Sequence, residues 1–299
     1  MLGLVSLPQL RALVAVAGHG SFSRAATALG ISQSAVSHAV STLERALGDR
    51  VVTRDAPARL TPLGSAVLPH ARQTVSSADA LAAAARAHHG VASGTLRLGA
   101  VTTACQGLVP SLLAHWSGAL PDVRIEVFEG DDEELPVWLE DDLVDAAILV
   151  DPESIREQDR VLARDSLAAL VRTDHPLADE PVFPVAELAA DGFICSVGGC
   201  LAQIRRLHEQ AGIELVVRQS VRELATIMSM VSQGLGVSAI PTIVRPALPA
   251  ELVLVPLDHT VVRTLVLAGP RSRTAHPLVG TIDDALTTWR APDHARSLT

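Results

Sequence analysis

The chain has 299 residues, of which 48% are hydrophobic and 19% charged, and its formal net charge is −9. These values are typical of a globular protein with two or three domains, each long enough to bury its own core. No apolar run reaches the roughly 18 residues that a membrane span needs, and the N-terminus has no secretory pattern, so we expect a cytoplasmic protein.

The charge is divided unevenly along the chain. Residues 1–90 hold eight arginines and four acidic residues, a formal charge of +4, so residues 91–299 carry −13. Attraction to phosphate is screened over about 10 Å at ordinary salt, so a positive charge on residues 1–90 alone is enough for contact with nucleic acid. The negative net charge does not exclude DNA as a partner.

Three short helices are expected in the first 48 residues. Residues 7–22 carry an apolar face at helical spacing, and a second face follows in residues 21–29, where Gly30 ends the run. A third apolar face repeats through Val36, Val40, Leu43 and Leu47. Ser32 is a suitable N-cap for the third helix and Gly48 a suitable C-cap. The pattern is helix, tight turn, helix.

The polar face of the third helix carries short donors and acceptors. Beside the capping Ser32, these are Gln33, Ser34, Ser37, His38 and Ser41. A major groove admits a helix, and side chains of this kind reach base edges and phosphate oxygens there. Two helices of an ordinary helical subdomain with a solvated face are the alternative interpretation.

The next segment favours DNA binding. Residues 51–64, VVTRDAPARLTPLG, predict two short strands around a proline-containing turn, with Arg54 and Arg59 on either side. Such a hairpin is a wing, and we expect its arginines to contact phosphate or the minor groove.

GSFSRAATALGISQSAVSHAVSTLERALG followed by VVTRDAPARLTPLG resembles the winged helix-turn-helix of LysR-type transcriptional regulators, over about the first 65 residues. The family usually has proline where Ser34 stands and arginine where His38 stands. A neutral histidine does not replace the guanidinium fork that reads guanine or clamps a phosphate, so we expect a site sequence or an affinity that differs from the family average.

A long helix is predicted from Pro62 to about His89. Roughly 27 residues at 1.5 Å each span about 40 Å, which is too long for one small domain. Its apolar stripe packs either against its own domain or against the same helix of a second copy. The resemblance implies the second arrangement, a homodimer through the linker helix that pairs further into a homotetramer.

Beyond Gly90, strands and helices alternate, which predicts parallel βαβ units. We expect strands at 95–100, 123–129, 146–150, 167–171, 192–194, 215–217, 237–240, 252–255 and 262–268, and helices at 107–116, 133–140, 185–190, 200–211, 222–233 and 277–289. The pieces LRLGAVTT, LPDVRIEVFEG, LVDAAILV, HPLADEPV and VSQGLGVSAIP resemble the effector-binding region of the same family, which is similar to periplasmic binding proteins. The resemblance implies that the chain crosses between two subdomains near Arg164 and near Gly269.

The predicted fold is therefore an N-terminal all-α winged helix-turn-helix with a long linker helix, followed by a C-terminal α/β effector domain of two Rossmann-like subdomains. The expected boundaries are 1–64 for the DNA-binding domain, 65–90 for the linker and 91–299 for the effector domain. Subdomain I takes about 91–164 and 269–299, and subdomain II about 165–268.

Ligands in open α/β sheets bind at the carboxyl ends of strands. Two loops at such ends are candidates, residues 101–105 and residues 195–200. The resemblance implies that both loops face the cleft between subdomains and hold a small, often carboxylated effector. The candidate effector-binding residues are Thr102, Thr103, Gly130, Asp132, Ser196, Gly198 and Thr226. The hydroxyls would alternatively just cap helices. Asp131 and Asp132 would repel an anion, so either they point away or the effector carries a positive group.

Cys105, Cys195 and Cys200 fall in the same two loops, without CxxC or metal-ligand spacing. A thiol at a helix N-terminus has a lowered pKa, so redox sensing is a second hypothesis, beside buried packing residues. Some members of the family sense peroxide through a cysteine pair, but of different spacing and sequence. A cysteine-dependent enzyme is a remote alternative, because no histidine pairs recognisably with a cysteine.

The prediction is an effector-responsive regulator that binds dyad-symmetric double-stranded DNA, and not an enzyme. We expect no cofactor, because neither a Walker loop nor a dinucleotide loop occurs, and no G-x-S-x-G motif that would mark a hydrolase.

Overall fold

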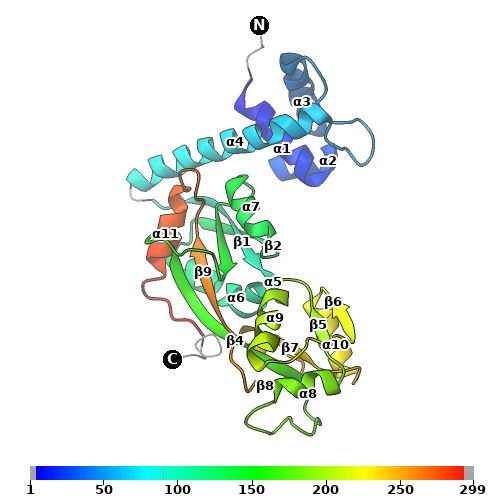
Figure 1. The fold of residues 1–299 in the computed structure, drawn as a ribbon. Coiled ribbons are helices and arrows are strands. Elements are labelled where there is room, and N and C mark those ends of the chain that lie inside the picture. Colours follow the sequence, from blue (N-terminus) through cyan, green and yellow to red (C-terminus); the bar gives the residue numbers. More distant parts are fainter. Residues whose placement is uncertain (1–4, 90, 293–299) are drawn as a thin grey trace. The chain divides into compact units, whose positions relative to one another are not determined.

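The computed structural model describes residues 5–89 and 91–292, which form two compact units (Figure 1). The first unit consists mainly of the chain up to Ser93, and the second of most of the chain from Gly94 onward. Within the described ranges, no helix combines the length and the apolar character that a membrane crossing requires.

The first unit is built from helices α1 (Leu7–His19), α2 (Phe22–Leu29), α3 (Gln33–Leu47) and α4 (Pro62–His88). The expected helices are thus confirmed. Ser32 caps α3 by accepting a hydrogen bond from the Ala35 amide at 3.2 Å, and Gly48 ends it in the left-handed region at φ 87°. The apolar faces of the helices meet in a core that includes Leu13, Val16, Val36, Val40 and Leu43.

The wing is simpler than expected. Residues 51–61, all of which the structure describes, form a β-bridge between Val52 and Leu60 and no regular strands. Around the bridge, the Thr53 amide donates to the Arg59 carbonyl at 2.7 Å, and the Thr61 amide donates to Val51 at 3.0 Å. The expectation of two strands was wrong, because the proline-containing turn leaves too few residues on each side for a ladder.

Helix α4 begins against the wing and continues far beyond it. Its first turn approaches so closely that a Cβ on Gly64 would lie 1.9 Å from the Val51 carbonyl oxygen. Leu68 and Ala71 belong to the core of the first unit, whereas Leu81 is 74% exposed.

The second unit is organised on a mixed sheet in the order β2, β1, β3, β9, β4 and β7. The strands are β1 (Gly94–Val101), β2 (Val123–Gly130), β3 (Ala146–Val150), β4 (Arg160–Arg172), β7 (Ser238–Pro241), β8 (Leu252–Pro256) and β9 (Val262–Ala268), with β5 (Ile194–Ser196) and β6 (Gln219–Val221) in a separate pair. Strand β1 runs parallel to β2 and β3, as predicted, and β9 is antiparallel to β3 and β4.

Helices connect the strands. They are α5 (Thr102–Gly107), α6 (Val109–Ala119), α7 (Glu134–Glu140), α8 (Val185–Ala190), α9 (Leu201–Ala211), α10 (Leu224–Ser232) and α11 (Pro277–Ala285), with a 3-10 helix η1 (Thr242–Ala247). The helix expected at 107–116 is α6, which begins at Val109 with Pro110 in its first turn. The short helix α5 that precedes it was not expected. The strand expected at 215–217 is displaced to β6, and Leu215 packs instead against the core that includes Phe183 and Phe193.

Strand β4 joins two lobes of this unit. Its residues 160–166 pair with β9, and its residues 167–172 pair with β7 and β8. We call the part around β1, β2, β3 and β9 the first lobe, and the part around β5 to β8 the second lobe. The first crossing lies at Ser166 and Leu167, near the predicted Arg164. Because β9 pairs with β3 and with the first half of β4, the return crossing lies between Pro256 and Val262, so the prediction near Gly269 was wrong.

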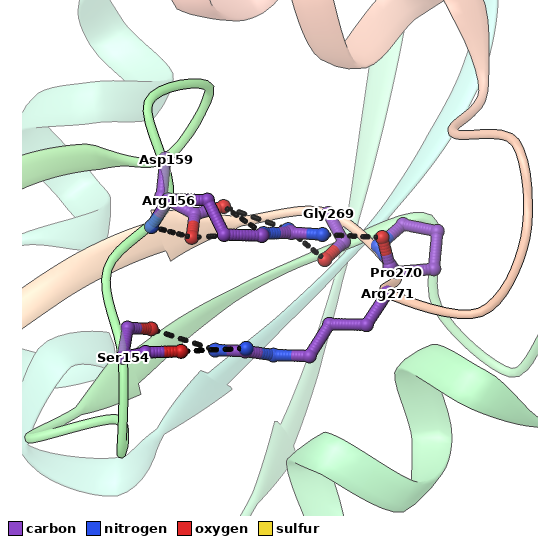
Figure 2. A network of polar contacts seen from close by, with 6 residues as sticks. All are labelled: Ser154, Arg156, Asp159, Gly269, Pro270 and Arg271. Atoms are coloured by element: carbon purple, nitrogen blue, oxygen red, sulfur yellow. Dashed lines mark hydrogen bonds and ion pairs between the residues drawn. The ribbon is translucent and has the colours of Figure 1, made fainter.

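Two arginines fix the segment after β9 to the first lobe (Figure 2). Arg156 donates to the Gly269 carbonyl at 2.7 Å and to the Pro270 carbonyl at 2.9 Å, while it also contacts the Asp159 carboxylate. Arg271 donates to the Ser154 carbonyl at 2.6 Å and to its hydroxyl at 2.8 Å. These bonds join the β3–β4 connection to Gly269, which explains why the chain does not leave the first lobe there.

Candidate nucleic-acid interface and ligand cavity

The polar face of α3 is open to solvent. Ser32, Gln33, Ser34 and His38 are exposed, and Ser37 and Ser41 are half-buried. The hydroxyls of Ser32 and Ser34 lie 2.9 Å apart, so both are engaged at the start of the helix. Gln33, Ser37 and His38 have no side-chain partner among the described residues, and their donors and acceptors are available to a ligand.

The two wing arginines differ in their surroundings. Arg54 donates to the Glu44 carboxylate at 2.7 Å and to the Ser41 hydroxyl at 2.9 Å, and its guanidinium carbon lies 5.2 Å from the centre of the Phe22 ring. The exposed Arg59 side chain has no such partner in the described part of the chain. Arg54 therefore ties the wing to α3, and Arg59 is the freer cation for a phosphate.

A hollow of about 380 Å³ lies where the starts of α2 and α3 meet the wing. Gln33 and Arg54 line it together with Arg24, an exposed residue of α2 that the sequence analysis did not select. The sequence shows Arg24 in the first turn after the Ser21 cap. Its closeness to Gln33 could not be predicted, because it depends on how α2 packs against α3. Arg24 adds a third arginine to this surface.

The second unit contains a cavity of about 160 Å³. Five of the predicted effector residues line it, namely Thr102, Thr103, Gly130, Asp132 and Gly198. Ser196 lines a neighbouring cavity of about 20 Å³ that shares Thr102, Thr103, Gly198 and Cys200 with the first. Thr226 is exposed on α10 and is not among the described residues that line either cavity. It lies outside the buried face of α10, which Leu224, Ile227, Met228 and Val231 form.

Gly198 has a structural role that differs from the expected one. A Cβ at this position would lie 2.4 Å from the Arg222 carbonyl oxygen, so the missing side chain lets two backbone segments of the second lobe approach each other. Similarly, a Cβ on Gly130 would lie 2.8 Å from the Trp138 ring. These glycines shape the cavity wall by close packing.

The arginines at the cavity are both paired with carboxylates. Arg263 contacts Asp165 through Nε at 2.9 Å and Nη2 at 2.8 Å, and both side chains are buried. Arg222 contacts Asp131 at 2.7 Å, and the Asp131 carboxylate also accepts the Glu134 amide at 2.9 Å. Neither arginine was selected from the sequence, because each is defined by a partner distant along the chain.

Asp132 differs from its neighbours because its carboxylate has no hydrogen bond or ion pair among the described residues, and its Oδ1 is closed off from solvent. Burial raises the pKa of Asp132 from its ordinary value of 3.8 to about 6. The Arg263 guanidinium lowers this pKa, and nearby carboxylates such as Asp131 raise it further. The folded carboxyl thus holds its proton more tightly than the unfolded one. Ionisation of Asp132 therefore destabilises the fold. This loss of stability is absent below about pH 4, grows as the pH rises, and is complete above about pH 6.

Replacing Asp132 by asparagine is therefore expected to raise the free energy of unfolding by about 2 kcal/mol at pH 7.5. At pH 4 the variant and the parent protein should unfold alike, because the parent carboxyl is then protonated in the fold. Urea denaturation of both proteins at the two pH values measures the difference. An equal effect at both pH values would contradict the assignment of the penalty to the ionised carboxyl.

The three cysteines are free thiols in different surroundings. Cys195 belongs to the core of the second lobe, Cys105 lies inside α5, and Cys200 lines both cavities. Burial raises the pKa of all three thiols, to about 12 for Cys105, so the lowered pKa that we expected at a helix N-terminus was wrong. For Cys200, the Arg263 guanidinium opposes this effect, with Nη1 lying 3.9 Å from Sγ.

Comparison with known proteins gives consistent matches. The model for bacterial regulatory helix-turn-helix proteins of the lysR family matches residues 7–65, and the model for the LysR substrate binding domain matches residues 89–290. The chain is 30% identical over 275 residues to the uncharacterized HTH-type transcriptional regulator YvbU of Bacillus subtilis (strain 168), covering 91% of this chain and 94% of that protein.

Two further similarities concern a second relative and a solved structure. A probable hydrogen peroxide-inducible genes activator of Mycobacterium avium is 35% identical over 254 residues, covering 81% of this chain and 78% of that protein. A full-length OxyR variant from Pseudomonas aeruginosa has a similar structure, with a TM-score of 0.71, 24% identity and 95% of each chain covered, a likeness that concerns the fold alone.

Proposed function

The chain belongs to the LysR family of transcriptional regulators, and on that basis we propose that α3 reads operator DNA while a small effector in the 160 Å³ cavity changes this binding. The observation that carries the proposal is the exposed polar face of α3 beside the wing arginines. An effector acts through its different affinities for two arrangements of the protein. Such a regulator works in the cytoplasm, and we expect it to have no catalytic activity.

The protein is proposed to bind DNA as a homodimer formed through α4. Two such dimers are proposed to pair into a homotetramer. Two copies of α3 would then contact the half-sites of a dyad-symmetric operator. We propose residues 1–64 as the DNA-binding domain, 65–90 as the linker and 91–299 as the effector domain. Here β9 is assigned to the first lobe, in agreement with its strand partners.

A gel shift with the DNA upstream of the chain's own gene tests the proposal. We expect specific retardation that unrelated DNA does not compete away, and a footprint with two symmetric halves. Retardation of all sequences with equal affinity would contradict operator reading. A thermal-shift screen of metabolites, followed by repetition of the gel shift with each hit, tests the effector part.

Gln33 and Arg59 should affect DNA binding in different ways. Gln33→Ala is expected to cost about 1 to 3 kcal/mol at particular base pairs, because an amide reads base edges. Arg59→Ala should weaken all sequences similarly and reduce the slope of log affinity against log salt by about 1, because it removes one phosphate contact. Binding titrations on matched and mutated operators at several salt concentrations separate the two. A uniform loss for Gln33→Ala would count against base reading.

Arg54 is a less direct test of phosphate contact than Arg59. Its side chain is bound to Glu44 and Ser41, so Arg54→Ala also loosens the wing. The Arg59 side chain carries no such internal contact among the described residues, and this makes it the cleaner choice.

A thiol response is a second candidate function, favoured by one observation. Cys200 lines the cavity and lies 3.9 Å from an Arg263 nitrogen that opposes the rise in the Cys200 pKa caused by burial, and a relative is a probable hydrogen peroxide-inducible genes activator. Attack of the thiolate on hydrogen peroxide would break the O–O bond and give a sulfenic acid and hydroxide, which takes a proton from solvent to form water. If so, Cys200→Ser abolishes a peroxide effect on DNA binding and Cys195→Ser retains it. An unchanged response in Cys200→Ser would exclude this function.

A further inference from the structure

The wall of the 160 Å³ cavity carries more negative than positive charge. Its lining includes the acidic residues Glu129, Asp131, Asp132, Glu134 and Glu223, against two arginines. Both arginines are already paired, Arg222 with Asp131 at 2.7 Å and Arg263 with Asp165 at 2.8 Å. An anionic ligand would therefore meet carboxylates without a free cation to bind, at a site where burial strengthens the repulsion.

Two polar groups at the cavity lack a partner in the described part of the chain. The Asp132 carboxylate accepts no hydrogen bond there, although its Oδ1 is closed off from solvent. The Thr103 hydroxyl, on a residue that is only 7% exposed, also has no side-chain hydrogen bond with a described residue. Oδ2 is the oxygen of the Asp132 carboxylate that is not closed off from solvent, so an acceptor and a hydroxyl that are unpaired among the described residues lie beside the same cavity and can be satisfied by a donor that is supplied from outside.

Three of the other four carboxylates are partly occupied. Glu129 accepts the Thr102 hydroxyl at 2.6 Å, Glu134 accepts the Asp131 amide at 3.1 Å, and Asp131 holds Arg222. The fourth, Glu223, is exposed to solvent, so Asp132 is the half-buried wall carboxylate with the most binding capacity left. A protonated amine or a guanidinium satisfies it fully, because such a group donates hydrogen bonds and also neutralises the buried charge.

We propose that the cavity binds a small cationic ligand, an ammonium or guanidinium compound, through the Asp132 carboxylate and the Thr103 hydroxyl. This inference rests on the proposed function, since it names the chemical class of the effector. The ligand neutralises the wall, and the remaining carboxylates exclude anions of the same size. The cavity admits a compact molecule that extends a few atoms beyond its cationic group.

Matched four-carbon probes test the charge preference. Putrescine is a dication, 1,4-butanediol a neutral analogue and succinate a dianion, and each is titrated into the full-length protein by calorimetry and thermal shift at pH 7.5. We expect putrescine to bind and to raise the melting temperature in a concentration-dependent way. The other two probes are expected to have at least tenfold lower affinity. Binding of succinate more tightly than putrescine, or of none of the three, overturns the proposal.

Variants locate the binding. Asp132→Asn should weaken putrescine at least tenfold, and Thr103→Val severalfold, whereas Glu133→Gln, which removes the same charge from an exposed neighbour outside the cavity, should leave the affinity unchanged. Equal affinity in Asp132→Asn and the parent protein overturns the proposal, because the dication then binds by diffuse attraction. Thr103→Val, which leaves the Asp132 charge in place, is an independent test, and parent-like affinity in this variant overturns the assignment of the hydroxyl to the ligand.

A gel shift with operator DNA separates this inference from the proposed function. Specific DNA binding without Asp132-dependent putrescine binding refutes only the ligand class. Asp132-dependent binding of putrescine by a protein that retards no DNA specifically refutes the regulator function and leaves the cation site in place.

Discussion

Replacing Arg263 by alanine is expected to lower the free energy of unfolding by about 3 to 5 kcal/mol, because it leaves a buried carboxylate without its counter-charge. Arg263 and Asp165 are only 1% and 0% exposed. They face each other in the register of β9 and β4, one residue before β4 leaves the first lobe, and two parallel N–H bonds of 2.9 and 2.8 Å join them. The Asp165 carboxylate also accepts the Ile243 amide at 3.2 Å.

Urea denaturation at pH 7.5 measures this effect, and two controls interpret it. The double variant Asp165→Asn with Arg263→Met should recover most of the loss, because asparagine still accepts the Ile243 amide and no buried charge remains. Arg222→Ala removes the exposed partner of Asp131 and should cost less than about 1 kcal/mol. A loss below about 1 kcal/mol in Arg263→Ala would show that water reaches Asp165 and that the pair is not structurally important.

The same pair illustrates what the sequence could not reveal. A continuous apolar run, typical of a buried strand in a parallel sheet, predicted β3 with the bounds that the structure has. The bounds of β9 were also predicted correctly, although this strand is antiparallel to its neighbours and carries Arg263. The first half of β4 was missed, because Arg164 and Asp165 interrupt its apolar pattern. A charged residue inside a buried strand is explained by its partner, and Arg263 lies 98 residues further along the chain.

Those parts of the candidate sites that depend on strand ends and on helix spacing could be predicted from the sequence. The end of β1 placed Thr102 and Thr103 at a cavity, and the helix pattern placed Gln33 on an open face of α3. Thr226 was assigned through the resemblance, and the face of α10 that it occupies could not be derived from spacing alone. Likewise, Arg54 is bound by residues of another element, and Asp132 is unpaired because no neighbouring element among the described residues supplies a donor. Neither property was predictable from the sequence.

Glu44 is the residue of the first unit whose loss should be most damaging. It lies on the buried side of α3, 9% exposed, and its Oε1 accepts the amides of Val51 and Val52 at 3.1 and 3.5 Å. Its Oε2 accepts Arg54 at 2.7 Å. One carboxylate therefore connects the recognition helix both to the backbone of the wing and to a wing arginine.

Glu44→Ala is expected to lower the free energy of unfolding by about 2 to 4 kcal/mol, because two buried amides lose their acceptor and Arg54 loses its counter-charge. Glu44→Gln keeps an acceptor for the amides and should lose less than half as much. Asp49→Asn, an exposed change of the same charge, should be neutral within about 0.5 kcal/mol. Urea denaturation compares the three variants.

DNA binding should follow the same order among these variants. A displaced wing removes contacts that do not depend on sequence, so Glu44→Ala is expected to weaken matched and mutated operators alike, in contrast to Gln33→Ala. Equilibrium titration at fixed salt measures both affinities. If Glu44→Ala kept the stability of the parent protein yet lost discrimination between operators, Glu44 would act in base reading, and its role as the anchor of the wing would be wrong. If stability and all affinities fell together, the rigid attachment of the wing to α3 would be a requirement for binding any sequence.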